Sequence, residues 1–300
     1  MDFLEKLKAK AAEGRYVCLG LDPVYEKIPD CVPGRHDPDA SDLEKAIVFY
    51  SFCVMVVDAT KDEVAAYKPN CAFFEALDWP GTMMLGRLIA YIRRVAPDVV
   101  IDLDAKRADI GKTNDGYATM AFDAMDADAI TVNPYFGEEA LRPFLDREGK
   151  GVIVLCRTSN EGAKEFQDRM VQLNPGEAEE YGLDPKTTHI PLYQLVACRV
   201  KRWTSNGHIA VVVGATYPEE LGVVRDILPA TVILIPGVGA QGGSLEQAVR
   251  QATKIAEAIF QLNAGSKVLF ASSDPDFAEK ARDGVVDMNQ QIDTILEAAA

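Results

Sequence analysis

Short apolar runs recur along the chain and alternate with longer stretches of helical period. Most of these runs are nearly continuous in Val, Ile, Leu and Ala, as is typical of parallel strands that are covered on both faces. We therefore predict strands at Tyr16–Leu21, Ala65–Lys68, Val99–Asp104, Ala129–Val132, Gly151–Leu155, Ile209–Val213, Val232–Ile235 and Lys267–Phe270.

The stretches between these runs carry apolar residues every three or four positions, as one face of a helix does. The first of them begins with SDLE, a capping box that marks the start of a helix. The N-terminal sequence MDFLEKLKAK also has the pattern of an amphipathic helix. Further helices are predicted at Ser41–Thr60, Trp79–Val95, Thr113–Met125, Glu138–Asp146, Pro191–Ser205, Glu219–Leu228, Ser244–Leu262 and Asp276–Ala298.

Eight strand-then-helix units predict an α/β protein with a closed (β/α)8 TIM barrel, formed as a single domain over residues 1–300 with an N-terminal helix. An open doubly wound sheet is the alternative, but the even number of units and the lack of an early GxGxxG motif count against it. Two connections are long, residues 24–40 and 157–190. Each is either a binding loop or lid at the C-terminal end of a barrel strand, or a decoration without a role in binding.

Composition and charge narrow the choice of partners. With 48% hydrophobic residues among 300, the chain can bury a large core. The net charge of −15 disfavours nucleic acids and anionic membranes as partners, and an anionic substrate would need a local concentration of cations. No apolar run approaches the roughly 20 residues of a membrane span, and the N-terminus lacks the apolar core of a signal peptide. We therefore expect a cytoplasmic protein.

The six cysteines and three histidines give no metal-binding pattern. The cysteines are scattered singly without a CxxC pair, which indicates reduced thiols and argues against a structural zinc site. The histidines lie far apart in the sequence, so a histidine metal site or a catalytic triad has little support. We predict no bound metal.

Charged residues follow the third predicted strand in the stretch VVIDLDAKRADIGKT. Because side chains alternate along a strand, Asp104 and Lys106 point to the same side, and Asp109 follows three residues later. A cation between two carboxylates is costly to bury, so a protein that only needed to fold would do better with apolar residues here. On this spacing alone, a surface ion-pair cluster at a strand end remains an equal alternative.

Polar residues at the ends of the other strands add weight to a functional interpretation. In a barrel the C-terminal ends of the strands share one mouth. Asp22 ends the first strand, Lys68 the second, and Thr158 and Ser159 follow the fifth. Any one of them, like Asn133 after the fourth strand, could be a capping or turn residue. Together, Lys68, Asp104 and Lys106 predict an alternating array of charges, which Asp109 could join.

The glycine-rich stretch GVGAQGG follows the seventh predicted strand. Its glycines allow backbone N–H groups to approach an anion closely, and Gln241 offers an amide at the tip. Phosphate sites are common at the loops after strands seven and eight of such barrels. Alone, however, a glycine-rich turn is weak evidence for phosphate.

Taken in order, six motifs resemble the orotidine 5′-monophosphate decarboxylase family. They are LGLDP, AYKPN, DAKRADIGKT, TVNPYFG, RTSNEGA and PGVGAQGG, and they extend from the first to the seventh predicted strand. The DAKR motif and the long loops resemble those of the bacterial subgroup with chains of about this length. The resemblance implies decarboxylation of orotidine 5′-monophosphate to uridine 5′-monophosphate in pyrimidine biosynthesis, without a metal or organic cofactor.

The resemblance also implies roles for individual residues. Asp22 and Lys68 would contact the ribose, Asp104 would lie against the substrate carboxylate, and Lys106 would donate the proton to C6. Asp109 and Thr113 would reach into the site of a partner subunit, which makes a homodimer with shared sites the functional unit. Other substrate contacts would come from Ser159, Gln241, Gly242 and Lys267.

Two departures from the family pattern stand out. The family usually has an arginine near strand eight that binds the phosphate, whereas this chain has Ser266 and Lys267 in that region. Lysine can neutralise a phosphate but lacks the bidentate fork of arginine. Asp102, two residues before Asp104, faces the same side of its strand at a position where an apolar residue is expected.

Two other functions remain open. Metal-dependent decarboxylases and aldolases of sugar phosphates share the barrel and the D-x-K-x-x-D segment, but Lys68 would repel the magnesium ion that they bind near this position. A catalytically silent barrel that binds nucleotides would gain support from the missing arginine and from Asp102. It would have no need, however, to retain a complete Lys/Asp array.

Overall fold

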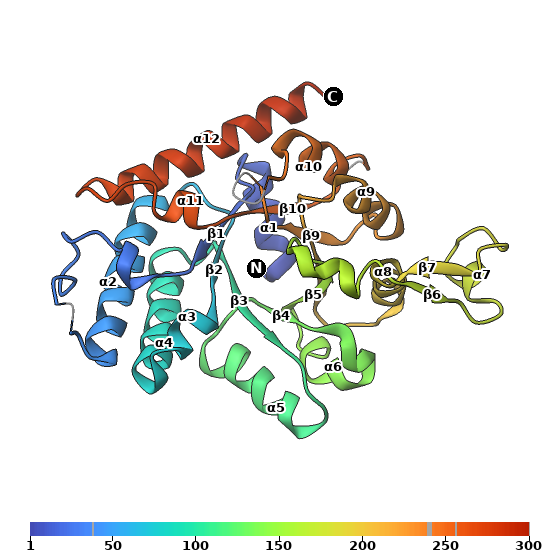
Figure 1. Ribbon diagram of the computed structural model, residues 1–300, viewed down its shortest axis with the longest axis horizontal. Helices are drawn as coiled ribbons and strands as arrows, with labels where there is room; N and C mark the ends of the chain where they lie inside the picture. The colour runs from blue at the N-terminus through green and yellow to red at the C-terminus, as the bar shows by residue number, and fades with distance from the viewer. Residues whose placement is uncertain (38, 239–241, 256, 300) are drawn as a thin grey trace.

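The computed structural model describes residues 1–37, 39–238, 242–255 and 257–299. Eight parallel strands close into a barrel in the order β1-β10-β9-β8-β5-β4-β3-β2, with helices around the outside (Figure 1). This architecture confirms the predicted (β/α)8 TIM barrel. The barrel strands are β1 (Val17–Leu21), β2 (Ala66–Pro69), β3 (Val100–Arg107), β4 (Ala129–Val132), β5 (Gly151–Arg157), β8 (His208–Val213), β9 (Val232–Ile235) and β10 (Phe260–Ala264).

Helices cover the outer face of the barrel, and several short helical turns lie in the connections. The long helices are α2 (Asp42–Thr60), α4 (Asp78–Val95), α6 (Gly137–Leu145), α8 (Leu192–Arg202), α9 (Pro218–Ile227), α10 (Leu245–Ala252) and α12 (Phe277–Glu297). The short ones are η1 (Tyr25–Lys27), α3 (Cys71–Glu75), α5 (Lys112–Ala118), the π-helical turn η2 (Thr119–Ala124), η3 (Pro134–Phe136), η4 (Glu161–Glu165), α7 (Glu177–Glu180) and α11 (Ser266–Leu269).

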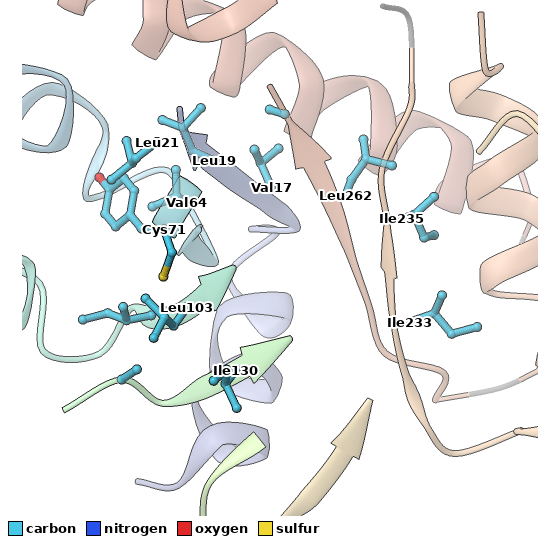
Figure 2. Packing of buried hydrophobic residues seen from close by; sticks show 14 of the residues in the cluster. Val17, Leu19, Leu21, Val64, Cys71, Leu103, Ile130, Ile233, Ile235 and Leu262 are labelled. Atoms are coloured by element: carbon cyan, nitrogen blue, oxygen red, sulfur yellow. The ribbon is translucent and has the colours of Figure 1, made fainter. Parts of the chain in front are cut away.

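Alternation along the strands divides the core into two layers. Outward residues such as Leu19, Leu262 and Ile235 belong to the large cluster between the barrel and its helices, part of which is drawn in Figure 2. Inward residues such as Cys18, Ala66 and Val100 form a smaller cluster inside the barrel. The side chains that face the barrel mouth are therefore those that continue this inward set.

The N-terminal helix α1 (Phe3–Ala12) closes the bottom of the barrel, at the end opposite the mouth. Phe3 and Leu7 pack into the inner cluster. Lys6 is buried and forms an ion pair with Asp128 at 3.1 Å. The helix predicted at the N-terminus is thus confirmed, and it covers this end of the barrel.

The prediction for the eighth strand is wrong. The strand lies at Phe260–Ala264, within the stretch predicted as the end of a helix, and residues Ser266–Leu269 form helix α11 where a strand was expected. Gln261 and Asn263 alternate with apolar neighbours because they face the inside of the barrel, so this strand lacks a continuous apolar run. Helix α10 ends at Ala252, and Glu257 in the following turn has a φ of +61°.

The connection between β5 and α8 forms an arm that projects from the side of the barrel (Figure 1). It contains a two-stranded antiparallel sheet of β6 (Met170–Gln172) and β7 (His189–Pro191), with α7 between them. The other long connection, residues 24–40, contains the 3-10 turn η1 and, in its described part, several further turns. Within the described residues, no helix combines the length and the apolar character that a bilayer span requires.

Candidate active site

A cavity of about 440 Å³ lies at the C-terminal ends of the barrel strands. This volume is in the range of small-molecule binding sites. Charged groups come from β2 and β3, polar groups from β4 and the connection after β5, and apolar groups from β5, β8 and β9. The lining residues are Lys68, Asp104, Lys106, Thr131, Leu155, Thr158, Ser159, Asn160, Gln167, Val212, Leu234 and Pro236.

Lys68, Asp104 and Lys106 form the alternating array that the sequence predicts. The Lys68 Nζ donates to Asp104 Oδ2 at 2.6 Å, and the Lys106 Nζ donates to Asp104 Oδ1 at 2.5 Å. Lys68 and Asp104 are buried, whereas the side chain of Lys106 is 51% exposed and faces the cavity. The array therefore presents one partly exposed cation to a ligand and anchors it on a buried carboxylate.

Mutual attraction outweighs burial in fixing the charges of this array. Burial by itself would raise the pKa of Asp104, but the positive charges of Lys68 and Lys106 hold it well below the usual range. Burial likewise favours the neutral amine of Lys68, but Asp104 and Asp22 raise its pKa above the ordinary value. Both groups are therefore charged at neutral pH.

A hydroxyl group of β4 fixes the backbone at Lys106, and sequence reasoning missed it. The Thr131 Oγ1 accepts from the N–H groups of Ala105 and Lys106, at 3.0 and 2.9 Å, and donates to Asp104 Oδ1 at 3.0 Å. The register between β3 and β4 shifts at this point. Lys106 has a φ of +46°, a backbone conformation that residues other than glycine rarely adopt. The only sequence signal for Thr131 is its inward position in a strand next to the array.

Two further residues that sequence reasoning missed hold the connection after β5 against the cavity. The guanidinium of the fully buried Arg157 pairs with Asp168 at 3.0 Å and stacks on the ring of Tyr217. The Gln167 side chain accepts from the Thr158 N–H at 2.8 Å. These contacts place Ser159, a predicted site residue, in the cavity wall.

Asp22 lies next to the array at the end of β1. Burial raises its pKa, and the Asp104 charge adds to this effect, while Lys68 and Lys106 oppose it. Its buried Oδ1 has no hydrogen-bond partner among the described residues, so it is available to a ligand. The predicted position of Asp22 beside Lys68 is thus consistent with the structure.

The structure does not bring Asp109 or Thr113 into this array. The Asp109 Oδ1 accepts from the Ile110 N–H at 2.7 Å, and in the described part of the chain no ion pair joins Asp109 to a lysine. Thr113 lies beside a separate cavity, together with Cys71 and Arg107. Neither residue therefore completes the site of its own chain.

The predicted phosphate-binding residues are only partly described. Gln241 lies outside the described residues. Gly242 is exposed and has a φ of +83°, which agrees with a tight turn after β9. Lys267 is exposed on α11 and lines a neighbouring cleft with Arg35 and Lys27, rather than the cavity around Lys68.

No cluster of three or more His, Cys, Asp or Glu side chains that could hold a metal ion occurs in the described ranges. Asn133, after β4, caps the turn η3 by accepting from the Tyr135 N–H at 3.0 Å. Its role is therefore that of a turn residue, which was one of the two interpretations of its sequence position.

Comparisons with known proteins place this geometry in a family. Residues 15–281 match the model of the "Orotidine 5'-phosphate decarboxylase / HUMPS family". The chain belongs to this family. An orotidine 5′-phosphate decarboxylase of Roseiflexus sp. (strain RS-1) is 40% identical over 300 residues, which cover 99% of this chain and all of its relative. One from Leptothrix cholodnii is 41% identical over 290 residues, which cover 94% of this chain and 93% of the other.

Solved structures of the family have the same fold. The OMP decarboxylase of Leishmania donovani superposes with a TM-score of 0.76 at 31% identity, and the match covers 98% of each chain. A protein of Toxoplasma gondii described as a putative orotidine-monophosphate decarboxylase gives a TM-score of 0.74 at 32% identity, with 97% of this chain and 98% of the other covered. The resemblance inferred from the six motifs is thereby confirmed.

Proposed function

We propose that this protein decarboxylates orotidine 5′-monophosphate to uridine 5′-monophosphate at the array of Lys68, Asp104 and Lys106, as a step of pyrimidine biosynthesis in the cytoplasm. The observation that carries the proposal is the anchored Lys106 ammonium, 2.5 Å from Asp104, at the wall of a cavity in a chain of the decarboxylase family. Asp22 and Lys68 would bind the ribose beside it.

The chemistry follows from the charges. Loss of CO2 leaves a carbanion at C6 that has no adjacent electron sink. An enzyme that works without a cofactor must therefore stabilise this charge electrostatically and quench it with a nearby acid. Lys106 does both, because it is a cation and a proton donor. Asp104 keeps the ammonium directed to one place, so little reorganisation is needed when the charge develops.

Phosphate binding is the part of the site in which this chain departs from the family pattern. Lys267 would supply positive charge after β10, and the glycine-rich sequence after β9, with Gln241 and Gly242, would offer polar donors. A remote phosphate that is bound tightly can contribute binding energy to the reaction at the pyrimidine.

We further propose a homodimer with shared active sites. Asp109 and Thr113 do not reach the array of their own chain, and Ile110, which follows Asp109, is an exposed apolar residue at 62% exposure. Burial of such a side chain would favour association with a second copy of the chain. In the dimer, Asp109 would extend the array of the partner.

The two alternatives have less support. A magnesium-dependent reaction on a sugar phosphate would place the divalent ion beside Lys68, whose charge would repel it. A silent nucleotide-binding barrel would have no reason to maintain a buried ion pair with its cost of desolvation. The three members of the array are in contact in this chain.

The test is a spectrophotometric assay with orotidine 5′-monophosphate in the presence of EDTA, in which the orotate absorbance is followed. Wild-type protein should turn over without added metal, and Lys106→Ala should lose turnover while still binding uridine 5′-monophosphate. Lys8→Ala, at an exposed lysine of helix α1 at the opposite end of the barrel, is the matched control and should remain active. Wild-type binding without turnover would indicate the silent barrel, and turnover that requires magnesium would indicate the sugar-phosphate reaction.

A further inference from the structure

The barrel interior contains a second carboxyl group below the array. Asp102 lies on β3, two residues before Asp104, with 0% of its surface exposed. The register of β2 against β3 pairs Ala66 with Val100 and Asn70 with Asp104, so Asp102 is level with Lys68 on the neighbouring strand. The two side chains face the same interior space.

Asp102 has few partners for a buried carboxyl group. The Cys18 thiol donates to its Oδ2 at 3.7 Å, which is a weak hydrogen bond, and its Oδ1 has no partner among the described residues. Gln261 on β10 is equally buried, and within the described structure neither its Nε2 nor its Oε1 has a hydrogen-bond partner. An ionised carboxylate in such surroundings is expensive, whereas a protonated one costs far less.

Asp102 and Asp104 compete for the positive charge of Lys68, and Asp104 has more stabilising contacts. Asp104 is 2.6 Å from Lys68 and also binds Lys106 and the Thr131 hydroxyl. Asp102 has neither of these additional contacts. When two carboxyl groups share one cation, the better-solvated or better-paired one keeps the negative charge and the other keeps the proton.

The charged and titratable groups around Asp102 support this division. Burial and the negative charge of Asp128 before β4 raise the pKa of Asp102 to about 7, although the positive charge of Lys68 on β2 opposes them. The Cys18 thiol on β1 and the nearby Gln261 amide on β10, which lies beyond hydrogen-bond geometry, also lower the pKa. The Asp128 charge is itself partly neutralised by its ion pairs with Lys6 and Arg93.

We propose that Asp102 is a positioning residue that takes up one proton from solvent when the anionic substrate binds above it, and so leaves the charge of Lys68 to Asp104 and the substrate. The inference rests on the proposed function. The phosphate that substrate and product share, and the carboxylate of the substrate, add negative charge above Asp102, which makes its anionic form still less favourable. The O–H bond that forms on binding breaks again when product leaves, and the proton returns to solvent.

Calorimetry measures this proton directly. Uridine 5′-monophosphate is titrated into the wild-type dimer and into Asp102→Asn in two buffers of different ionisation enthalpy, between pH 5 and pH 9, and the difference in heat gives the protons taken up. Titration of the ligand phosphate is common to both proteins and cancels. Wild type should take up more protons than the variant, by up to about one per site, with the largest difference near or just above pH 7.

Steady-state kinetics add a measurement that a merely structural role would not change. Wild-type kcat/KM should fall above pH 7, by up to about tenfold per pH unit, whereas the profile of Asp102→Asn should remain flat to about pH 8.5. Below pH 6 the two proteins should agree within about threefold, because asparagine resembles the protonated acid. The matched control Gln261→Leu keeps the titrating group, so it should retain proton uptake, with the maximum moved to higher pH.

Equal proton uptake by wild type and Asp102→Asn across this range would overturn the inference, even if turnover is normal. If the variant does not fold, infrared difference spectra of wild type decide instead, because binding at pH 8 should create the C=O stretch of a protonated carboxylic acid. Absence of that band would equally refute the proposal. Failure of wild type to bind uridine 5′-monophosphate at all would contradict the proposed function, and the inference with it.

Discussion

Replacement of Thr131 by valine is the sharpest test of how the site is built. The change keeps the shape of the side chain but removes the hydroxyl that accepts from the N–H groups of Ala105 and Lys106 and donates to Asp104. Loss of these hydrogen bonds leaves two N–H donors unpaired and should destabilise the native conformation of this segment by about 2–4 kcal/mol. A non-glycine residue at positive φ costs of order 1–3 kcal/mol to maintain.

The hydrogen bonds of the Thr131 hydroxyl contribute more free energy than the strained backbone at Lys106 costs. Without them, this backbone should relax from its φ of +46°. A displacement of about 1 Å at a reacting group can reduce the rate about 100-fold, so kcat should fall by roughly this factor while KM changes little. The assay is steady-state decarboxylation of orotidine 5′-monophosphate, with urea unfolding of the same samples. The free energy of unfolding should fall by less than the roughly 2–4 kcal/mol of the lost contacts, because relaxation of the backbone recovers part of the strain.

Thr131→Ser is the matched control, since it retains the hydroxyl and loses only a methyl group. It should keep kcat within about threefold of wild type. If Thr131→Val also stayed within that margin, or if the serine variant lost as much activity as the valine variant, the argument that this hydroxyl positions Lys106 would be wrong.

Three further predictions concern the array, the dimer and the phosphate. A 1:1 mixture of Lys106→Ala and Asp109→Asn chains should recover about a quarter of wild-type activity, because half of the dimers contain one intact site. Asp104→Asn should lower the free energy of unfolding at pH 7 by about 3–5 kcal/mol, since it leaves Lys68 buried without its partner. Lys267→Ala should raise KM for the substrate by about tenfold with little change in kcat, as loss of one phosphate contact predicts.

Each of these has a direct control. Each variant alone should be nearly inactive before mixing, and a mixture that remains inactive after exchange of subunits would contradict the shared site. In wild type the raised pKa of Lys68 contributes stability below its unfolded value of about 10.5, and this contribution is lost as pH rises through the folded value. The deficit of Asp104→Asn should therefore shrink in alkaline solution. An unchanged KM for Lys267→Ala would assign phosphate binding to the turn around Gly242.

Seven of the barrel strands are readable from the sequence because they contain short, mostly apolar runs, such as Val152–Leu155 and Val232–Ile235, which are apolar on both faces. The eighth is not, because Gln261 and Asn263 turn polar side chains into the barrel. The spacing of apolar residues in this stretch therefore matches a continuation of helix α10. The apolar run in α11 matches a short buried strand, and only the closed barrel shows which of the two segments is the eighth strand.

The same contrast applies to the site. Lys68, Asp104 and Lys106 could be predicted, since strand alternation and the shared mouth of a barrel bring them together. Thr131 and Arg157 could not, because their roles depend on a register shift and on the path of a loop. Asp102 was conspicuous in the sequence, but its meaning depends on the competition with Asp104, which requires coordinates.

Helix α1 has a consequence for the order in which the protein is made. It is synthesised before the barrel strands, yet the residues it contacts follow much later in the chain: the Phe3 N–H donates to the Gly149 carbonyl at 3.1 Å, and the Asp2 carboxylate contacts His208 at 3.0 Å. Helix α1 therefore cannot complete its docking, and Phe3 and Leu7 remain exposed, until more than two thirds of the chain has been synthesised. Docking of α1 is thus a late event of biosynthesis, and a nascent chain stalled before β8 should remain open to proteases at its N-terminus.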